Sequence, residues 1–451
     1  MNTGNSGNTG MAVLGGGITG LATAFFASKA GLPVTVFEKD GRLGGNCITF
    51  RRGEFSFDSG AHRIHDKYTD VTDLAVELLH DDLLTIDIPS QVFDTGHLLK
   101  FPFSLRNLLF HLGPIKTFRG GLEILFENIA IPQKQSFEHS ARRRYGRTVA
   151  DRFLLNYTEK LWGISCDRLS PELTGGRLKG LDMRRLMAEI LGLHPRRRDM
   201  EGVFLYPRHG IGMLSDSLVN GSENARFQTN TEITAVYHES RHITGIRTSA
   251  GEEIPLKYCV STIPLPRLLH VLEPPAPYSV ISASESLRYR DLLLVALLID
   301  KPSITQAATV YFPSRDFPFT RVAEPRNRSV AMSPEGKSSL VVEIPHHQGD
   351  DWGRTDDTSI PERIIDVLED IGWIRSSRVL DTAVESLHHA YPVISLEAKQ
   401  ALGLIEEYIS GFTNLRIIGR TGAFRYSWIH DHIADAHASV AGIVRDRDWF
   451  E

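Results

Sequence analysis

Two histidines three residues apart, His62 and His65, lie in the segment DSGAHRIH, residues 58–65. His62 and His65 could ligate a metal ion, act on a bound cofactor, or form a structural pair of neutral imidazoles. A metal site needs at least one further ligand, and no additional cluster of ligand-type residues in the sequence indicates one. We therefore expect no metal ion at these histidines and interpret His65 as structural. For His62, a role beside a cofactor and a structural role both stay open on the residues alone.

The length and composition of the chain indicate the class of protein that carries these histidines. The chain has 451 residues, of which 41% are hydrophobic and 23% charged, so we expect two or three globular domains. A formal net charge of -5 gives no reason to expect nucleic acid as a partner. Three scattered cysteines without a CxxC pair favour a reducing cytosol, and no apolar run reaches the roughly 18 residues of a membrane span. We expect a cytoplasmic protein without a transmembrane segment.

A glycine motif near the N-terminus predicts a dinucleotide site. Gly15, Gly17 and Gly20 fit GxGxxG between the strand-like run MAVL and a helix of small apolar residues, and a second strand ends at Glu38. Such glycines allow a tight turn and a close approach of the backbone to a pyrophosphate at the helix N-terminus. Glu38 is placed to accept hydrogen bonds from ribose hydroxyls. Strand, glycines, helix, strand and acid occur in the order that the motif requires.

The next segment, GRLGGN, narrows the choice of cofactor. It supplies Arg42, Gly44, Gly45 and Asn46 directly after the acid. From Val13 to this asparagine, the chain resembles the FAD-binding start shared by amine oxidases, protoporphyrinogen oxidases, carotenoid desaturases and UDP-galactopyranose mutases. The resemblance implies FAD rather than NAD, with the second glycine motif beside the FAD phosphates.

The expected fold class is α/β, with a Rossmann-like FAD-binding domain interleaved with a substrate domain made of a mixed sheet and helices. Strand-like and helical patterns alternate along the chain, and the resemblance implies that it passes repeatedly between the two domains. The predicted segments are a disordered leader at 1–10, FAD-binding parts at 11–100, 206–285 and 401–451, a helical substrate region at 101–205 and a substrate-domain sheet at 286–400.

Short patches along most of the chain are similar to UDP-galactopyranose mutases. They are GGN (44–46), GAHRIH (60–65), NYTEKLWG (156–163), YRDLLL (289–294), FTRVAEPRN (319–327), AYPV (390–393) and GRTGAFRY (419–426). The resemblance implies an isomerase of a nucleotide-diphosphate sugar, which interconverts its pyranose and furanose rings through N5 of reduced FAD. It implies catalytic roles for His62, Arg290 and Arg420, and cofactor contacts from Gly419 and Arg420. The substrate contacts that it implies are Tyr157, Trp162, Arg177, Arg290, Tyr311, Arg321, Tyr391 and Tyr426.

One segment departs from the mutase pattern. Mutases usually follow GRLGxYxY with YDM, whereas this chain has SWIHDHI at 427–433, and EKLWG and GxFRY also occur in protoporphyrinogen oxidase-like relatives. A FAD-dependent oxidoreductase that removes hydride from its substrate therefore stays the alternative. The convergence of arginines with the aromatic YTEKLW patch favours an anionic nucleotide sugar as the small-molecule substrate. A homodimer is a possible assembly for a chain of this size.

Overall fold

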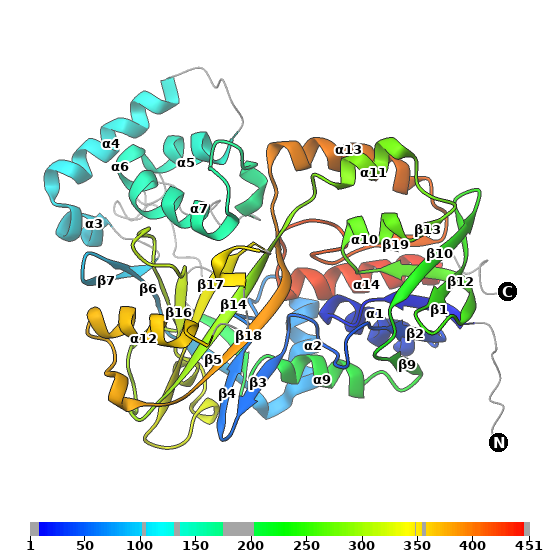
Figure 1. Ribbon diagram of the computed structural model, residues 1–451, viewed down its shortest axis with the longest axis horizontal. Coiled ribbons are helices and arrows are strands. Elements are labelled where there is room, and N and C mark those ends of the chain that lie inside the picture. Colours follow the sequence, from blue (N-terminus) through cyan, green and yellow to red (C-terminus); the bar gives the residue numbers. More distant parts are fainter. Residues whose placement is uncertain are drawn as a thin grey trace.

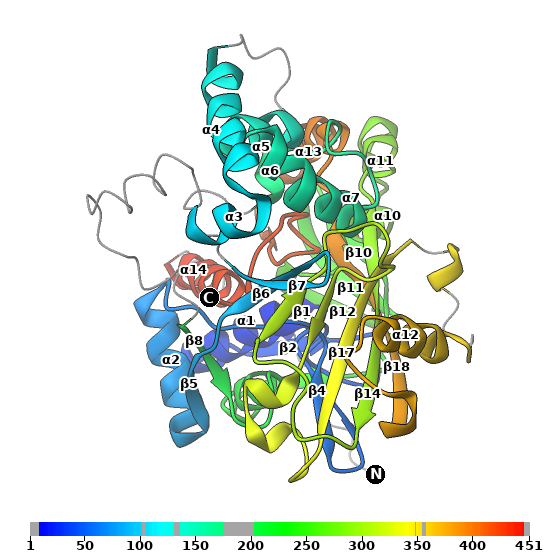
Figure 2. The same cartoon turned by 90° about the vertical axis from the view of Figure 1, so that its left-hand side faces the viewer.

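The computed structural model describes residues 9–101, 105–129, 136–174, 203–347, 349–353 and 358–445. It contains two large sheets side by side, with a group of helices above one of them (Figures 1 and 2). The predicted α/β fold is confirmed. Within the described residues, no helix is long and apolar enough to cross a bilayer.

The first sheet has eight strands in the order β13-β10-β11-β12-β1-β2-β9, with β19 paired to β12. Its strands come from three distant parts of the chain: β1 (Thr9–Leu14), β2 (Val34–Phe37), β9 (Ala225–Gln228), β10 (Ile233–Glu239), β11 (His242–Thr248), β12 (Glu253–Ser261), β13 (Leu272–Glu273) and β19 (Leu415–Ile417). β1 begins two residues inside the predicted leader and pairs in parallel with both β2 and β12. A strand buried between parallel neighbours has to be apolar, as MAVL is.

Helix α1 (Ile18–Lys29) is buried on almost every side because this sheet and the neighbouring α14 (Ile429–Arg445) both pack against it (Figure 1). Its small side chains, ITGLATAFFASK, permit that close packing. The N-terminus of α1 follows β1 after a short glycine turn, so it opens at the carboxyl edge of the sheet. Ligands of doubly wound sheets bind at this edge.

The second sheet has seven strands in the order β18-β14-β17-β16-β15-β6-β7. These are β6 (Ser90–Asp94), β7 (His97–Phe101), β14 (Tyr289–Ile299), β15 (Thr309–Tyr311), β16 (Arg321–Ala323), β17 (Ser338–His346) and β18 (Val379–Pro392). Alternate residues of β14 face opposite sides: Leu293 and Val295 pack with α12 (Ile360–Asp370), whereas Leu292 and Leu294 belong to the central core. The hairpin β6–β7 joins this sheet through β15, although all of its residues except Phe101 fall in the predicted first FAD-binding part.

Helices stand over one end of the second sheet (Figures 1 and 2). They are α3 (Leu105–Leu112), α4 (Pro114–Ile129), α5 (Phe137–Tyr145), α6 (Arg147–Val149), a π-helical turn (Ala150–Leu155) and α7 (Asn156–Trp162). Gly163 ends α7 with a left-handed φ of 70°, a conformation that favours glycine.

The remaining elements connect the sheets or cover their edges. They are β3 (Thr49–Arg52), β4 (Phe55–Asp58), α2 (Thr69–Leu79), β5 (Leu83–Asp87), β8 (Val203–Pro207), α9 (Gly212–Asn220), α10 (Leu265–His270), α11 (Tyr278–Ser284) and α13 (Leu396–Ser410). The predicted substrate residue Arg177 lies outside the described residues.

Candidate active site

The turn after β1 brings the first glycine motif against the acid that ends β2. Gly15 has a φ of 100°, and the Gly16 amide donates to Oε2 of Glu38 at 2.6 Å. The Asp40 amide donates to Oε1 of the same carboxylate at 2.9 Å. Two backbone donors thus fix Glu38 at the sheet edge, where it was predicted to receive ribose hydroxyls.

The two glycine motifs lie against each other at the N-terminus of α1. Gly17 and Gly44 form a parallel bridge, and a Cβ on Gly45 would lie 3.0 Å from the Cα of Gly17. A Cβ on Gly20 would lie 2.0 Å from the carbonyl oxygen of Gly15, so this position has no room for a side chain. Gly17 is the N-cap of α1 and makes no side-chain cap. The bare backbone here fits a pyrophosphate, whose charge the helix N-terminus stabilises.

Three further predicted cofactor residues, Gly419, Asn46 and Arg42, have different surroundings. Gly419, with a φ of 85°, lies against Thr19 in the first turn of α1. Asn46 donates to the carbonyl oxygen of His388 at 3.3 Å, and the exposed Arg42 guanidinium lies 5.2 Å from the centroid of the Phe50 ring. Gly419 therefore shares the helix N-terminus with the first glycine motif, whereas Arg42 lies at the rim.

His62 lies in the loop after β4 with its ring fixed by a neighbouring serine. Its Nε2 is 3.1 Å from Oγ of Ser59. Burial, followed by the charges of Arg420 and Arg321, lowers the pKa of His62 to about 3. The imidazole is therefore neutral at physiological pH and suits hydrogen bonding rather than acid catalysis. The ring of His65 instead packs 4.9 Å from that of Trp428.

Five predicted aromatic side chains gather between α7 and the second sheet. Tyr157 meets Tyr311 edge-to-face at 5.7 Å between ring centroids. Trp162 lies 5.8 Å from Tyr391 and 5.7 Å from Tyr426, and these two tyrosines stack at 6.3 Å. The residues come from α7, β15, β18 and the segment after β19, so only the fold brings them together. Stacked rings of this kind provide flat surfaces for a planar base.

Arg420 lies beside this aromatic group. Its guanidinium carbon is 5.7 Å from the Tyr391 ring centroid and 5.5 Å from that of Tyr426. Nε and Nη2 donate to the Ser427 carbonyl oxygen at 3.2 and 2.7 Å, and Nη1 donates to that of Ala390 at 3.1 Å. Within the described residues, these hydrogen bonds all go to carbonyl oxygens, so no carboxylate neutralises the cation. Arg420 can offer its charge to an anion.

Arg321 differs because a carboxylate pairs with it. Its Nε donates to Oε2 of Glu343, and its Nη2 donates to the Tyr391 hydroxyl at 2.7 Å. Arg321 is 7% exposed and Glu343 only 1%. Although burial alone would lower the pKa of Arg321, the Glu343 carboxylate raises it well above the ordinary value. The pair fixes Tyr391 in the site.

Sequence reasoning missed Glu343, although a signal was present. It is an acid inside the fully buried nine-residue strand SSLVVEIPH. A carboxylate in such a strand needs a partner, and β17 pairs Glu343 with Arg321 of β16.

The guanidinium of Arg290 is used by the fold. It donates to the carbonyl oxygens of Lys160 and Leu161 at 3.3 Å and to that of Pro345 at 2.8 Å. Burial lowers the pKa of Arg290 to about 10. Arg290 thus holds the C-terminal end of α7, the helix that carries Trp162, against β17. These contacts make it a support for the aromatic group rather than a member of it.

The departing segment 427–433 joins the His62 loop to α14. Asp431 accepts from Lys67 Nζ at 2.6 Å, from the Tyr68 hydroxyl at 3.1 Å and from the Trp428 amide at 3.0 Å. Although burial alone would raise the pKa of Asp431, the Lys67 and Trp428 hydrogen bonds lower it below its usual value. The segment therefore fixes the carbonyl group of Ser427, which orients Arg420.

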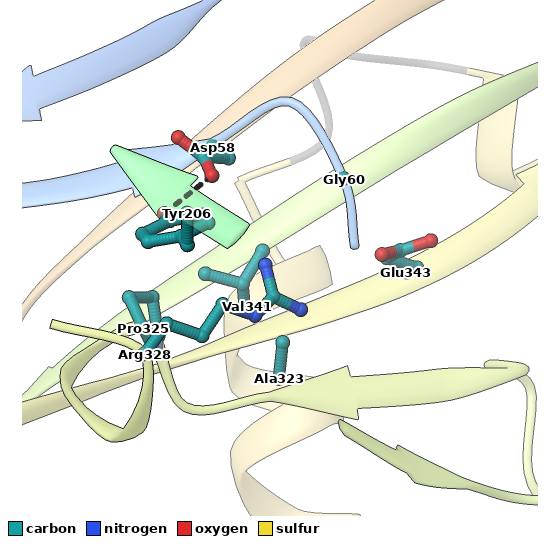
Figure 3. Close-up of a pocket in the computed structure, with 8 residues that line it drawn as sticks. All are labelled: Asp58, Gly60, Tyr206, Ala323, Pro325, Arg328, Val341 and Glu343. Carbon is teal, nitrogen blue, oxygen red and sulfur yellow. Dashed lines mark hydrogen bonds between the residues drawn. The ribbon is translucent and has the colours of Figure 1, made fainter. Parts of the chain in front are cut away.

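A cavity of about 10 Å³ lies beneath Gly60 (Figure 3). On one side, Asp58 accepts from the Tyr206 hydroxyl at 2.5 Å. Glu343 lies on the opposite side, and the Arg328 side chain extends from below Tyr206 toward the middle. In the described part of the chain, Nε of Arg328 and Oε1 of Glu343 are buried without a hydrogen-bond partner. The cavity has room for a single water molecule and none for a substrate.

The chain is similar in sequence to one protein family and to several curated proteins. Residues 18–393 match the model of the flavin-containing amine oxidoreductases. A coproporphyrinogen III oxidase of Staphylococcus aureus is 23% identical over 54% of this chain, and the match spans 58% of that relative. A 4,4'-diaponeurosporene oxygenase of Staphylococcus haemolyticus is 21% identical over 80% of each chain.

Among solved structures, a reduced UDP-galactopyranose mutase superposes with a TM-score of 0.81 at 22% identity, over 97% of this chain and 96% of that one. At this identity the likeness shows the fold. The family match covers most of the chain, and the glycine cradle at α1 fits the predicted cofactor. The chain therefore belongs to the flavin-containing amine oxidoreductase family, with FAD as its cofactor.

Proposed function

We propose that this flavoenzyme acts on a nucleotide-diphosphate sugar and isomerises its ring between pyranose and furanose forms. The observation that carries the proposal is Arg420, a guanidinium whose hydrogen bonds within the described chain go only to carbonyl oxygens, beside the stacked Tyr391 and Tyr426. A cation next to flat aromatic surfaces suits a ligand that combines a diphosphate with a planar base. The likeness of fold to a UDP-galactopyranose mutase supports the same substrate class.

Each residue of the site has its own role in the proposed reaction. Bound in its reduced form, FAD supplies a nucleophile for the anomeric carbon. Arg420 stabilises the charge that develops on the leaving diphosphate, because a fixed cation in a site shielded from water acts without reorganisation. Arg321 contributes mainly through Tyr391, since Glu343 already neutralises it. Neutral His62 accepts or donates a hydrogen bond, and the aromatic rings of Tyr157, Trp162, Tyr311 and Tyr426 hold the base.

Under this proposal the first sheet and its glycine turns bind FAD, and the second sheet with the helices above it binds the substrate. Arg290 is proposed to act through α7, by holding Trp162 in place, rather than on the diphosphate. The cytoplasmic location and the homodimer stay predictions.

A FAD-dependent oxidoreductase that takes hydride from its substrate is the second candidate. The curated relatives favour it, because they are named as an oxidase and an oxygenase, and the second spans 80% of this chain. In such an enzyme the aromatic group would contact an apolar substrate, and Arg420 would serve the fold or FAD.

Binding of UDP to the FAD-bound enzyme tests the proposal. We expect UDP to perturb the flavin absorbance, and Arg420→Met to weaken kcat/KM for a UDP-sugar by about 100-fold or more, as loss of a charge-stabilising donor does. Arg425→Met is the matched control, because Arg425 is exposed and pairs with Asp435. Equal losses in both variants, or no response to UDP, would remove the anionic substrate and leave the oxidoreductase.

A further inference from the structure

The hydroxyl group of Ser59 has a complete set of hydrogen bonds. Ser59 is 3% exposed and lies between β4 and His62. Its Oγ is 2.8 Å from the carbonyl oxygen of Asn46, 3.3 Å from the Ile48 amide nitrogen and 3.1 Å from Nε2 of His62. A hydroxyl offers one hydrogen and two lone pairs, so three contacts use all of its capacity.

The types of these partners assign every hydrogen. The Asn46 carbonyl can only accept, so it takes the hydroxyl hydrogen. The Ile48 amide can only donate, so it takes one lone pair. The remaining lone pair faces Nε2 of His62, which must therefore carry a hydrogen. The opposite assignment would leave two acceptor oxygens 2.8 Å apart with no hydrogen between them, inside the protein where an unmade hydrogen bond is costly.

We infer that Ser59 is a positioning residue that holds His62 in the Nε2–H tautomer, so that Nδ1 keeps its lone pair for the active site. Ser59 Oγ contacts Nε2, the Asn46 carbonyl also forms a hydrogen bond with the His62 ring, and the ring remains partly exposed. Nδ1 therefore serves as the acceptor for an N–H or O–H group of the cofactor or substrate.

The surroundings of His62 decide what this acceptor can do. Burial and the nearby Arg420 and Arg321 charges lower the pKa of His62 to about 3, so the ring is a weak base. It orients a donor without taking its proton. The tautomer stands on the Ser59 geometry alone, and only the identity of the donor at Nδ1 rests on the proposed function.

Nitrogen NMR of the FAD-bound, substrate-free enzyme tests the tautomer directly. The chain has 18 histidines, so the His62 signals are assigned by their loss in His62→Gln after ¹⁵N-histidine labelling. We expect a protonated Nε2 and an unprotonated Nδ1, unchanged across neutral pH. A protonated Nδ1 in the wild-type enzyme would overturn the inference, whatever the variants do.

Three variants then test the role of Ser59. Ser59→Ala removes the acceptor, so the two nitrogen shifts should move toward a tautomeric average, with the preference for Nε2–H reduced by roughly fivefold, the worth of one hydrogen bond. Ser59→Thr keeps a hydroxyl and should keep the wild-type spectrum, as should Ser56→Ala on β4. An unchanged spectrum in Ser59→Ala would refute the positioning role. Because no substrate is present, this result does not depend on whether the enzyme catalyses the mutase reaction. A failed tautomer prediction would likewise leave the proposed mutase function untouched.

Discussion

Substitution of Gly17 should weaken FAD binding without destabilising the folded protein. A Cβ at this position would meet only the Cα of Gly45, at 3.9 Å, which is ordinary van der Waals contact. Its φ of -71° and ψ of 174° are open to any residue. Gly17→Ala therefore costs the protein without FAD less than about 1 kcal/mol, the cost of an altered helix N-cap.

The bound form should respond differently, because the new methyl group stands where the pyrophosphate approaches the N-terminus of α1. Loss of that favourable interaction is worth about 1–2 kcal/mol, which weakens FAD binding by roughly 5- to 30-fold. Titration of the apoprotein with FAD, followed by flavin fluorescence, measures this change. Thermal unfolding of the same apoprotein measures the fold.

Gly20→Ala is the matched control. Its Cβ would lie 2.0 Å from the Gly15 carbonyl oxygen, so α1 could not keep its distance from β1, and the unfolding midpoint of the apoprotein should fall. An unchanged FAD dissociation constant in Gly17→Ala would refute the placement of the pyrophosphate. A fall in its apoprotein midpoint as large as that of Gly20→Ala would show that Gly17 serves the fold.

Three further predictions concern charged residues. Arg290→Ala should lower the unfolding midpoint and raise KM by loosening α7, and a loss confined to kcat would contradict this. Glu343→Gln should destabilise the enzyme by about 3 kcal/mol because Arg321 is left as a buried unpaired cation, as chemical unfolding would show. The pKa of Asp431 is lowered in the folded protein, so its contribution is complete above about pH 4 and is lost as pH falls through the folded value. Asp431→Asn should flatten this acid dependence, and an equal dependence in both proteins would contradict the Lys67 contact.

Local patterns in the sequence predicted the elements whose partners are close along the chain. The cofactor turn is an example, because Gly15, Glu38 and the strands around them lie within thirty residues of one another. The hairpin of β6 and β7 is equally local, since Asp94-Thr95-Gly96 between its strands is a turn sequence. The sheet that receives this hairpin was not predictable, because Ser90 pairs with Thr309 across more than two hundred residues.

In the site as well, the sequence predicted the type of residue but not the surroundings that decide its role. Arg290 and Arg420 have identical side chains, and the sequence resemblance implied a catalytic role for both. Only the fold shows that both guanidinium groups donate to backbone carbonyls, and that Arg420 in addition lies beside two tyrosine rings. Ser59 carries no signal in the sequence, because its role depends on a carbonyl and an amide brought to it by the chain's own turn.

The most direct test of the central claim is turnover without net redox change. The FAD enzyme is reduced with dithionite under anaerobic conditions and incubated with UDP-galactopyranose and with its furanose isomer, and both sugars and the flavin spectrum are followed. We expect interconversion of the two sugars while the flavin stays reduced and no reductant is consumed. No interconversion, together with rapid reduction of the oxidised flavin by a C–H or C–N substrate, would contradict it and establish the oxidoreductase.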